Sequence, residues 1–382
     1  MKILIIGNFS FEKEGGASVV ANYLIREYKK SGYEVDILSF FAETKKKEEK
    51  DFWGDKVGIF KVFSGKLSRV FSQFLDIYNP HSIYLLKREI QRIKPDIIHL
   101  HNIHKDISAY SVKLIHRLNI PVIITLHDFW ALCPGFNLEN NEMGEIRCRK
   151  PLSRFQLPFF LRNFFIKRFI SCANYIIVPS DFARLKLLDY GYSGDKVKRI
   201  YNGVDLDMFF PLTDKNAFKE TPVKIIFVGR ITRKKGAEFL KKACEELQQE
   251  GFEIVLEMIG NDKSVPYAGL SEHYRQADIC VQPSLVHETF GLTIIEAMAC
   301  SLPIIVTDMG AMPEIVGDAG IIIKSGDIAD LKSALKDLIL NSEKRAHLGV
   351  KGCQRVKYFF DWNNNAQEYL NYLEKIKLKI NL

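Results

Sequence analysis

The stretch from Ile279 to Ala299, ICVQPSLVHETFGLTIIEAMA, changes its pattern twice. Its first part, ICVQPSL, is a short apolar run typical of a buried strand, and the polar HET that follows indicates a loop. The last part, FGLTIIEAMA, favours a helix, whose first backbone N–H groups have no partner within the helix. Gly291 stands near the start of this helix and, having no side chain, lets a ligand approach the backbone closely. The stretch therefore predicts a strand, a loop and a helix with a binding position at its beginning.

Two glutamates eight residues apart, Glu288 and Glu296, flank Gly291. Acidic residues near a helix N-terminus can simply complement its dipole, an effect of well under ~1 kcal/mol. Glu296, however, lies in the apolar segment TIIEAMA, and a carboxylate on a buried helix needs hydrogen-bond donors. The vicinal hydroxyls of a sugar or ribose are suitable donors. We therefore interpret the two carboxylates as binding different hydroxyl groups, rather than as an acid–base pair.

Runs rich in Val and Ile, each followed by Gly or a polar residue and then by an amphipathic stretch, recur along the chain. They are KILIIGN, EVDILSF, DIIHLHN, VIITLHD, YIIVPSD, KIIFVGR, EIVLEMIG, ICVQPS and PIIVTD. This alternation predicts an α/β fold with parallel sheets, in which ligands bind beyond the carboxyl ends of the strands. A polar, turn-rich passage over 202–222 separates two such series, which indicates two doubly wound domains in the 382 residues. We expect domains at 1–208 and 209–360 and a helix over 361–382 that crosses back to the N-terminal domain.

The net charge of +8 comes from the first half of the chain, because residues 1–210 hold 32 Lys and Arg against 23 Asp and Glu. Such a basic half predicts a polyanionic partner, and no nucleic-acid recognition motif accompanies the charge. The segment 151–170, PLSRFQLPFFLRNFFIKRFI, combines six phenylalanines with basic residues and contains no acidic one. It suits insertion into an anionic membrane surface, and the alternative is a core helix with basic ends.

The expected localisation rests on two features that the sequence does not show, a membrane-spanning run and a signal peptide. No apolar run approaches the ~18–20 residues of a membrane-spanning helix, and the N-terminus meets Gly and Glu too early for a signal peptide. We expect a cytoplasmic protein that is peripheral on the inner face of the cell membrane. The seven cysteines are scattered, without a C-x-x-C pair, and we expect all of them to be free thiols.

Two further motifs could bind an anion. Gly15 and Gly16 follow the first strand and precede a helix, so their backbone N–H groups could face a phosphate, although a Gly-Gly pair can also be a simple turn. Neither the dinucleotide fingerprint nor the P-loop lysine motif is present, which argues against a dehydrogenase or an NTPase. Arg230 ends a predicted strand and Lys235 follows a short loop later, a combination that suits a pyrophosphate, the alternative being solvated basic residues.

Histidines gather at two neighbouring strand ends. His99 and His101 share one face of their strand and could form half of a metal site, but His127 and Asp128 alone offer further ligands, so we favour hydrogen-bonded sheet histidines. His104 follows in the same run. His127 ends VIITLHD, where a neutral imidazole could donate a hydrogen bond to a sugar hydroxyl or to a developing negative charge. The alternative is that His127 only caps or packs.

Together these motifs resemble the retaining glycosyltransferases of family 4, and the resemblance extends over nearly the whole chain. Its most specific part is the block of Glu288 and Glu296 around FGL. The segments KPDIIHLHNIHKDIS and TLHDFWALCP are most similar to family members that build bacterial surface polysaccharides. The resemblance implies the GT-B fold, in which two doubly wound Rossmann-like domains face each other across a cleft, the acceptor on the N-terminal and the nucleotide sugar on the C-terminal domain.

The resemblance also implies roles for individual residues. The implied catalytic residues are His127, Arg230, Lys235 and Glu288. The implied donor-binding residues are Gly15, Gly16, Arg230, Lys235, Phe290, Gly291, Leu292 and Glu296. By this resemblance the glycines and the helix start face the donor phosphates, the two cations neutralise the leaving diphosphate, and Glu296 holds the ribose. Glu288 contacts the transferred sugar, and His127 lies against it near the reaction centre.

The implied reaction moves a sugar from a nucleotide diphosphate sugar to an acceptor hydroxyl with retention of the anomeric configuration. The expected acceptor is a glycan or a lipid-linked glycan precursor in capsule, exopolysaccharide or lipopolysaccharide assembly. No metal and no other cofactor are expected, because positive side chains and helix ends supply the charge. Two alternatives are a GT-B sugar-nucleotide epimerase and a catalytically silent sugar-nucleotide-binding scaffold. The transferase pattern and the full set of implied catalytic residues disfavour both.

Three departures from the family pattern bear on the pocket. The family usually has Gly at Ser301 and Gly-Gly at Gly310-Ala311. The segment 259–278 is shorter than usual, where relatives carry an extra helix that helps to frame the nucleotide base. The base of the donor therefore does not follow from the resemblance.

Overall fold

The computed structural model describes residues 1–8, 15–41, 48–50, 56–61, 74–104, 106–136, 138–140, 146–148, 156–211, 222–260 and 265–380. The chain divides into two compact units, one made of Met1–Ile200 with Glu368–Leu382 and the other of Tyr201–Gln367. The domain limits expected from the sequence stay a prediction, because compactness alone does not show which segments fold independently.

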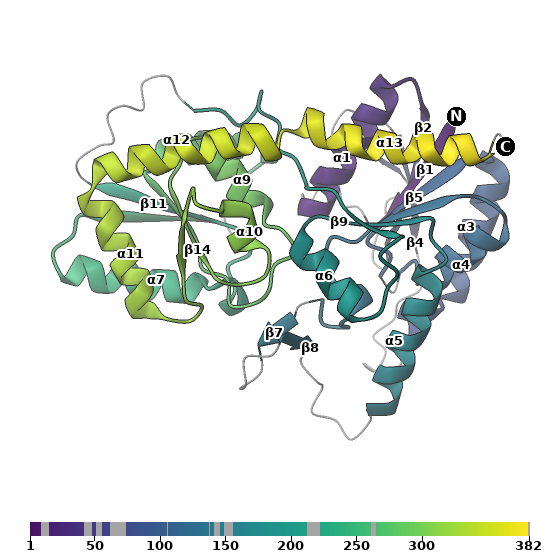
Figure 1. Cartoon of the computed structure of the whole chain (residues 1–382), viewed down its shortest axis with the longest axis horizontal. Coiled ribbons are helices and arrows are strands. Elements are labelled where there is room, and N and C mark those ends of the chain that lie inside the picture. The colour runs from purple at the N-terminus through teal and green to yellow at the C-terminus, as the bar shows by residue number, and fades with distance from the viewer. Residues whose placement is uncertain are drawn as a thin grey trace. The chain divides into compact units, whose positions relative to one another are not determined.

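The first unit contains a sheet whose described strands lie in the order β10-β9-β6-β5-β1-β2-β4-β3 (Figure 1). Neighbouring strands are parallel, except that β3 is antiparallel to β4. The strands are β1 (Lys2–Gly7), β2 (Glu34–Phe41), β3 (Glu48–Lys50), β4 (Lys56–Lys61), β5 (Ile97–His101), β6 (Val122–Thr125), β9 (Tyr175–Val178) and β10 (Val197–Arg199). The helices are α1 (Gly16–Lys30), α3 (Pro80–Ile93), α4 (Tyr110–Arg117), the short 3-10 helix η1 (Phe129–Ala131), α5 (Gln156–Ile170) and α6 (Asp181–Asp189).

The register of the central strands decides which side chains meet at the carboxyl edge of this sheet. Gly7 at the end of β1 pairs with His101 at the end of β5, and His101 pairs with Thr125 at the end of β6. Every residue of β5 and β6 is buried, as expected for strands covered by helices on both faces. The residues that follow these three strands therefore emerge close together.

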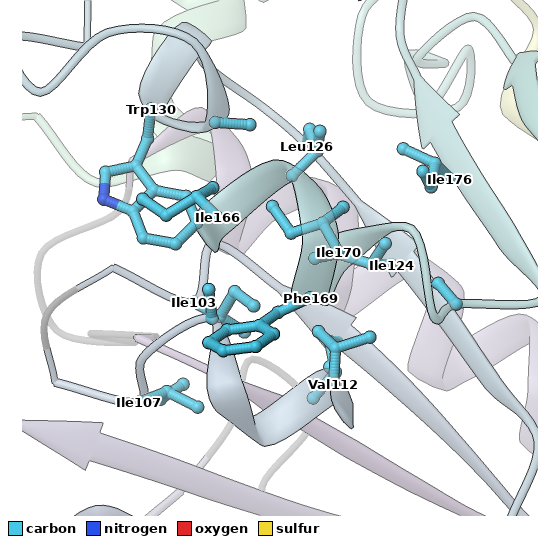
Figure 2. Close-up of a cluster of buried hydrophobic side chains, with 14 of the residues drawn as sticks. Ile103, Ile107, Val112, Ile124, Leu126, Trp130, Ile166, Phe169, Ile170 and Ile176 are labelled. Carbon is cyan, nitrogen blue, oxygen red and sulfur yellow. The ribbon is translucent and has the colours of Figure 1, made fainter. Parts of the chain in front are cut away.

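The core of the first unit includes one side of α5. Ile166, Phe169 and Ile170 point from α5 into a cluster with Val112 and Ile124 and are themselves buried (Figure 2). Each such side chain contributes roughly 1.5–3 kcal/mol through burial. The alternative of a core helix with basic ends is thus correct for this face of α5. Residues 151–155 of the predicted membrane-binding segment lie outside the described residues.

The other side of α5 is apolar and exposed. Phe160, Leu161, Phe164 and Phe165, here called the α5 surface, have exposed fractions of 68%, 41%, 52% and 37%. In the part of the chain that the structure describes, no helix has both the length and the apolar character needed to cross a bilayer. The apolar outer face of α5 is therefore a surface feature of the first unit.

The second unit has its own parallel sheet, with described strands in the order β12-β11-β13-β14-β15 (Figure 1). The strands are β11 (Val223–Val228), β12 (Ile254–Ile259), β13 (Ile279–Gln282), β14 (Ile304–Thr307) and β15 (Ile321–Ile323). Its helical elements are η2 (Arg233–Lys235), α7 (Ala237–Gln249), η3 (Tyr267–Gly269), α8 (Leu270–Gln276), α9 (Leu292–Ala299), α10 (Met312–Val316), α11 (Ile328–Leu340) and α12 (Ser342–Phe359). The last helix, α13 (Trp362–Ile380), begins in the second unit, and its residues from Glu368 onward belong to the first.

The α/β fold predicted from the sequence is confirmed. Each of the nine Val/Ile-rich runs forms a strand, namely β1, β2, β5, β6, β9, β11, β12, β13 and β14. The helix predicted from Phe290 begins at Leu292 instead. Gly291 has a φ of +104°, outside the helical range, and so forms the cap of α9 rather than its first turn.

The expectation that all seven cysteines are free thiols was wrong, because Cys133 and Cys148 form a disulfide bond. A hairpin of β7 (Leu138–Asn140) and β8 (Ile146–Cys148) returns the chain to the turn after η1, which brings the two Cα atoms to 5.3 Å. The remaining five cysteines are free thiols, and all but Cys172 are buried.

Candidate functional site

In the second unit, candidate residues follow the ends of β11 and β13. Arg230 is exposed two residues beyond β11, and Lys235 ends η2 on the same loop. Gly236 then turns the chain with a φ of +73°. A Cβ at Gly236 would lie 1.8 Å from the Pro283 carbonyl oxygen, so only glycine allows this loop to approach the end of β13 so closely.

This approach joins Lys235 to Glu288. Lys235 Nζ lies 2.5 Å from Glu288 Oε1, and Ser284 Oγ lies 3.0 Å from the same carboxylate oxygen. Lys235 and Glu288 keep exposed fractions of 26% and 20% for their side chains, so the pair remains open to solvent and to a ligand. The Lys235 ammonium, a group that suits a phosphate, thus lies next to the Glu288 carboxylate, a group that suits sugar hydroxyls.

The backbone of Glu288 is held by the loop that follows β14. Glu288 forms a β-bridge with Gly310, and its carbonyl oxygen accepts a hydrogen bond from the Ala311 N–H at 2.9 Å. Gly310 has a φ of +68°, and a Cβ there would lie 2.3 Å from the Glu288 carbonyl oxygen. The first glycine of the family's Gly-Gly pair is thus required at this position, and Ala311 supplies its N–H without needing to be glycine.

The start of α9 combines an open backbone with a buried side chain. Gly291 caps the helix without a side-chain hydrogen bond, and Gly291 and Leu292 are both partly exposed. Phe290, by contrast, is 2% exposed, and its ring packs 5.7 Å from that of Phe360. The Phe290 side chain therefore fixes the loop in the core, while the first turn of α9 is accessible.

Glu296 is buried, with 2% of its surface exposed. The Tyr274 hydroxyl donates to Oε2 at 3.0 Å, and Tyr267 also hydrogen-bonds to this carboxyl group. Burial raises the pKa of Glu296 to about 7, although the two tyrosine hydrogen bonds oppose the rise. Neither tyrosine was predicted from the sequence. The signal available was their position in YAGLSEHY, two phenols in the segment before β13.

In the first unit, the predicted histidines form a row that is joined by hydrogen bonds and by a contact between the rings of His99 and His101. Tyr28 Oη lies 3.1 Å from His99 Nδ1, and His99 Nε2 lies 2.8 Å from Thr125 Oγ1. His101 Nδ1 lies 2.9 Å from His127 Nε2, and these two rings are stacked with centroids 5.2 Å apart. The interpretation of His99 and His101 as hydrogen-bonded sheet histidines is confirmed.

These three imidazoles are neutral at pH 7. Burial lowers the pKa of His99 to about 3 and that of His127 to about 4, and it lowers the pKa of His101 well below its usual value. The neighbouring histidines add to the effect for His99 and His101, because a second positive charge would be close by. Each ring therefore has one N–H donor and one acceptor nitrogen.

His104 differs from the other three. Burial alone would lower its pKa, but the charge and hydrogen bond of Asp128, whose Oδ2 lies 3.0 Å from His104 Nε2, act together with the charges of Asp76 and Asp106 and raise it. Asp128 also accepts the Trp130 N–H at 2.8 Å and so caps η1. The pair therefore fixes the loop that follows His127. Across the described residues, no cluster of three or more His, Cys, Asp or Glu is arranged to hold a metal ion.

Gly15 and Gly16 lie at the N-terminus of α1, after the end of β1. Gly15 caps the helix and is exposed, and, its chain neighbours aside, no atom of the described residues lies within 4 Å of the place that a Cβ would occupy. No acidic residue lies in the first turn of α1. The backbone of this helix start is thus accessible, as an anion-binding position requires.

Two tandem α/β units with parallel sheets, each with polar residues beyond the carboxyl ends of its strands, form the architecture of the GT-B class of glycosyltransferases. The sequence model of Glycosyltransferase Family 4 matches residues 14–208, and that of Glycosyl transferases group 1 matches residues 222–341. The chain belongs to glycosyltransferase family 4, and it is a glycosyltransferase.

Individual proteins support the same assignment. The chain is 25% identical over 392 residues to D-inositol 3-phosphate glycosyltransferase of Paenarthrobacter aurescens, covering 92% of this chain and 91% of that one. It is 26% identical over 305 residues to sulfoquinovosyl transferase SQD2 of Arabidopsis thaliana, a match that covers 72% of this chain but only 55% of the Arabidopsis protein. The fold matches that of Anabaena HepE in complex with UDP-glucose with a TM-score of 0.68 and 17% identity, over 98% of this chain and all of the other.

Proposed function

We propose that this protein transfers a sugar from a nucleotide diphosphate sugar to an acceptor hydroxyl, with retention of the anomeric configuration. The observation that carries the proposal is the arrangement of Lys235 and Glu288, 2.5 Å apart, beside the open start of α9. It offers a cation for a diphosphate, a carboxylate for sugar hydroxyls and free backbone N–H groups for phosphate oxygens. HepE, which shares the fold, binds UDP-glucose, and this supports a nucleotide sugar as the donor here.

The proposed chemistry depends on charge at the leaving group. As the bond between the sugar and the diphosphate breaks, negative charge grows on the phosphate oxygens. Arg230, Lys235 and the N-terminus of α9 would stabilise that charge, and electrostatic stabilisation of this kind commonly contributes more to catalysis than any other effect. Because side chains and backbone supply the positive charge, we propose that the reaction needs no metal ion. Activity that survives EDTA would support this, and loss of activity that Mg²⁺ restores would contradict it.

The polar groups of the transferred sugar and the ribose would be held separately. Glu288 would accept hydrogen bonds from the transferred sugar once the diphosphate has attracted Lys235 away from it. Glu296 would bind the ribose hydroxyls, with Tyr267 and Tyr274 holding its carboxyl group in place. In the first unit, His127 would contact the transferred sugar as a neutral imidazole, and Gly15 and Gly16 would face the phosphates.

For the acceptor we propose a lipid-linked glycan precursor of a bacterial surface polysaccharide, reached by docking on the inner face of the cell membrane. The α5 surface supports this, because it exposes four large apolar side chains on one helix, and ring contacts through the buried Phe169 connect it to α4 and to Tyr78. Phe165 lies 5.9 Å from Phe169, Phe169 lies 5.4 Å from Tyr110, and Tyr110 lies 5.1 Å from the exposed Tyr78.

Charge favours the same partner. The helix α5 contains no acidic residue and has Lys167 and Arg168 in its last turn, and Lys113 of α4 lies over the Phe169 ring at 5.2 Å. Aromatic side chains flanked by cations suit the interface of an anionic bilayer, where each cation near the surface contributes ~1 kcal/mol.

Donor binding is tested by thermal shift with UDP-, GDP-, ADP- and TDP-sugars. A ligand that binds only the folded protein stabilises it, by about 2.7 kcal/mol at a hundredfold excess over its Kd. We expect the nucleotide sugars of one base to raise the melting temperature. Retention is tested separately by proton NMR during slow hydrolysis of the donor, where the sugar first released should have the same anomeric configuration as the donor. No shift with any nucleotide sugar would contradict the proposal.

Membrane docking is tested by co-sedimentation with vesicles of phosphatidylglycerol and of phosphatidylcholine. We expect binding to the anionic vesicles that weakens with salt and falls in a Phe160→Ser, Phe164→Ser double variant. The matched control is Tyr358→Ser, which removes an aromatic side chain that is 77% exposed on α12. If both variants bind like the wild type, the α5 surface does not dock on membranes.

A further inference from the structure

His101 is the buried partner of the proposed sugar-contacting residue. It lies at the end of β5 with none of its surface exposed, whereas His127, beyond the end of β6, is partly exposed. Their rings are nearly parallel, at 16°, and their nitrogens Nδ1 and Nε2 are 2.9 Å apart. His101 thus has no surface open to a substrate, and its hydrogen bond to His127 is the contact through which it can act on the reaction.

The hydrogen bond between them constrains the chemistry of His127. A neutral imidazole has one N–H, and its other nitrogen is an acceptor. If His101 donates to His127 Nε2, then His127 Nδ1 is the donor nitrogen. If His127 donates instead, its Nδ1 is an acceptor. Whether Nδ1 of His127 donates a hydrogen bond to a ligand or accepts one is therefore decided at its bond to His101.

The surroundings hold His101 in place. The His99 ring lies 4.1 Å from the His101 ring on the same face of β5, and His99 is itself fixed by Tyr28 of α1 and Thr125 of β6. The Tyr369 ring of α13 lies 5.8 Å from His99. Four elements of the first unit thus fix one end of the row, and the partly exposed His127 forms the other.

We propose that His101 is a positioning residue that holds His127 in one ring plane and one tautomer. This inference rests on the proposed function, since it is the contact of His127 with the transferred sugar that gives the tautomer a consequence. The bond itself can be tested without any substrate.

The test uses protein labelled with ¹⁵N in its histidine rings, because the nitrogen shifts of a neutral imidazole distinguish N–H from bare nitrogen. Two variants form a matched pair. His101→Asn places an amide near the position of Nδ1 and can still bond to His127 Nε2, whereas His101→Leu fills a similar volume without a polar group. His127→Ala identifies the His127 signals.

We expect a single tautomer of His127 in the wild type and in His101→Asn, and a mixture in His101→Leu. With the nucleotide sugar that raises the melting temperature of the wild type, the turnover rate should fall roughly 10- to 100-fold in His101→Leu and stay within about threefold in His101→Asn, and the KM for that donor should change little. Melting temperatures would show that each variant is folded.

The outcomes separate the two proposals. A mixed tautomer in the wild type, or a His127 tautomer that is unchanged in His101→Leu, would overturn the role of His101 whatever the activity. Full turnover by His127→Ala would instead contradict the proposed contact of His127 with the sugar. If His101→Leu does not fold, the wild-type spectrum and His101→Asn still decide the matter.

Discussion

Lys235 Nζ and Glu288 Oε1 form an ion pair between the loop after β11 and the loop after β13, at a distance of 2.5 Å. Both side chains are partly exposed, so solvent screens the pair and it contributes little to stability. A diphosphate offers more negative charge and more acceptor oxygens than one carboxylate, and it should compete with Glu288 for the ammonium. Donor binding would then free Glu288 for the sugar. The ion pair thus keeps Lys235 and Glu288 in place before the donor binds, and separating them costs little free energy.

Lys235→Ala should lower kcat/KM for the nucleotide sugar roughly 10- to 100-fold, because a hydrogen bond to a charged group is worth about 1.5–3 kcal/mol. The matched control is Lys234→Ala, which removes an equal charge from the exposed preceding residue of η2. Steady-state kinetics measure both. Equal losses in the two variants would show that only the general positive potential matters, and not Lys235 itself.

Glu296 makes stability depend on pH. Burial raises its pKa from 4.5 to about 7, so between these values the folded protein binds a proton that the unfolded chain does not. The stabilisation from that proton is complete below about pH 4.5 and is lost as the pH rises through about 7. Glu296→Gln, which resembles the protonated form, should therefore lose less stability than the wild type between pH 5 and pH 8.

The measurement is the free energy of unfolding in urea at these two pH values. The difference between wild type and variant should change by about 2.5 kcal/mol between these two pH values, from about 1.4 kcal/mol for each tenfold change in the proton equilibrium. Glu245→Gln, on the exposed side of α7, serves as the control and should follow the wild type. Parallel curves for wild type and Glu296→Gln would mean that Glu296 titrates normally.

The features predicted best from the sequence are those that depend on one continuous segment of the chain. The run VIIT of β6 is buried throughout, because a parallel strand covered on both faces needs apolar side chains at every position. The three-residue strands β10 and β15 were not predicted, because they are too short to form such a run. The fold class and nine of the strands could thus be predicted, whereas the short edge strands β10 and β15 could not.

The candidate site shows the same limit. Gly291 and Glu288 could be placed from one stretch of sequence, because a loop and a helix start are local features. The partners of Glu296 come from η3 and α8, and the disulfide partner of Cys133 comes from a hairpin. Such pairings are formed by tertiary structure, and a single sequence gives no spacing rule for them.

Ser301 has a φ of +55°, a left-handed conformation that costs a residue with a side chain roughly 1 kcal/mol. The family usually has glycine at this position, and Ser301→Gly should stabilise the protein by about 0.5–1 kcal/mol. Because Ser301 lies in the second unit, Tyr201–Gln367, this gain should raise the melting temperature by a few degrees or less. The opposite control is Gly349→Ala, whose Cβ would lie 2.2 Å from the Ser301 carbonyl oxygen and should destabilise the fold. A lower melting temperature in Ser301→Gly would mean that the serine side chain makes a favourable contact that outweighs its backbone strain.

The disulfide Cys133–Cys148 closes a loop with a sequence separation of 15 residues next to η1, where Asp128 and Trp130 lie. Restricting a loop of this length in the unfolded chain stabilises the folded state by about 3 kcal/mol. A Cys133→Ser, Cys148→Ser double variant should therefore unfold at a lower temperature than the oxidised wild type, and a reductant should lower the wild type to a similar value. The same reductant should leave the double variant unchanged, which controls for effects on the buried free thiols. If reductant lowers the melting temperature of both proteins equally, the bond does not account for the loss.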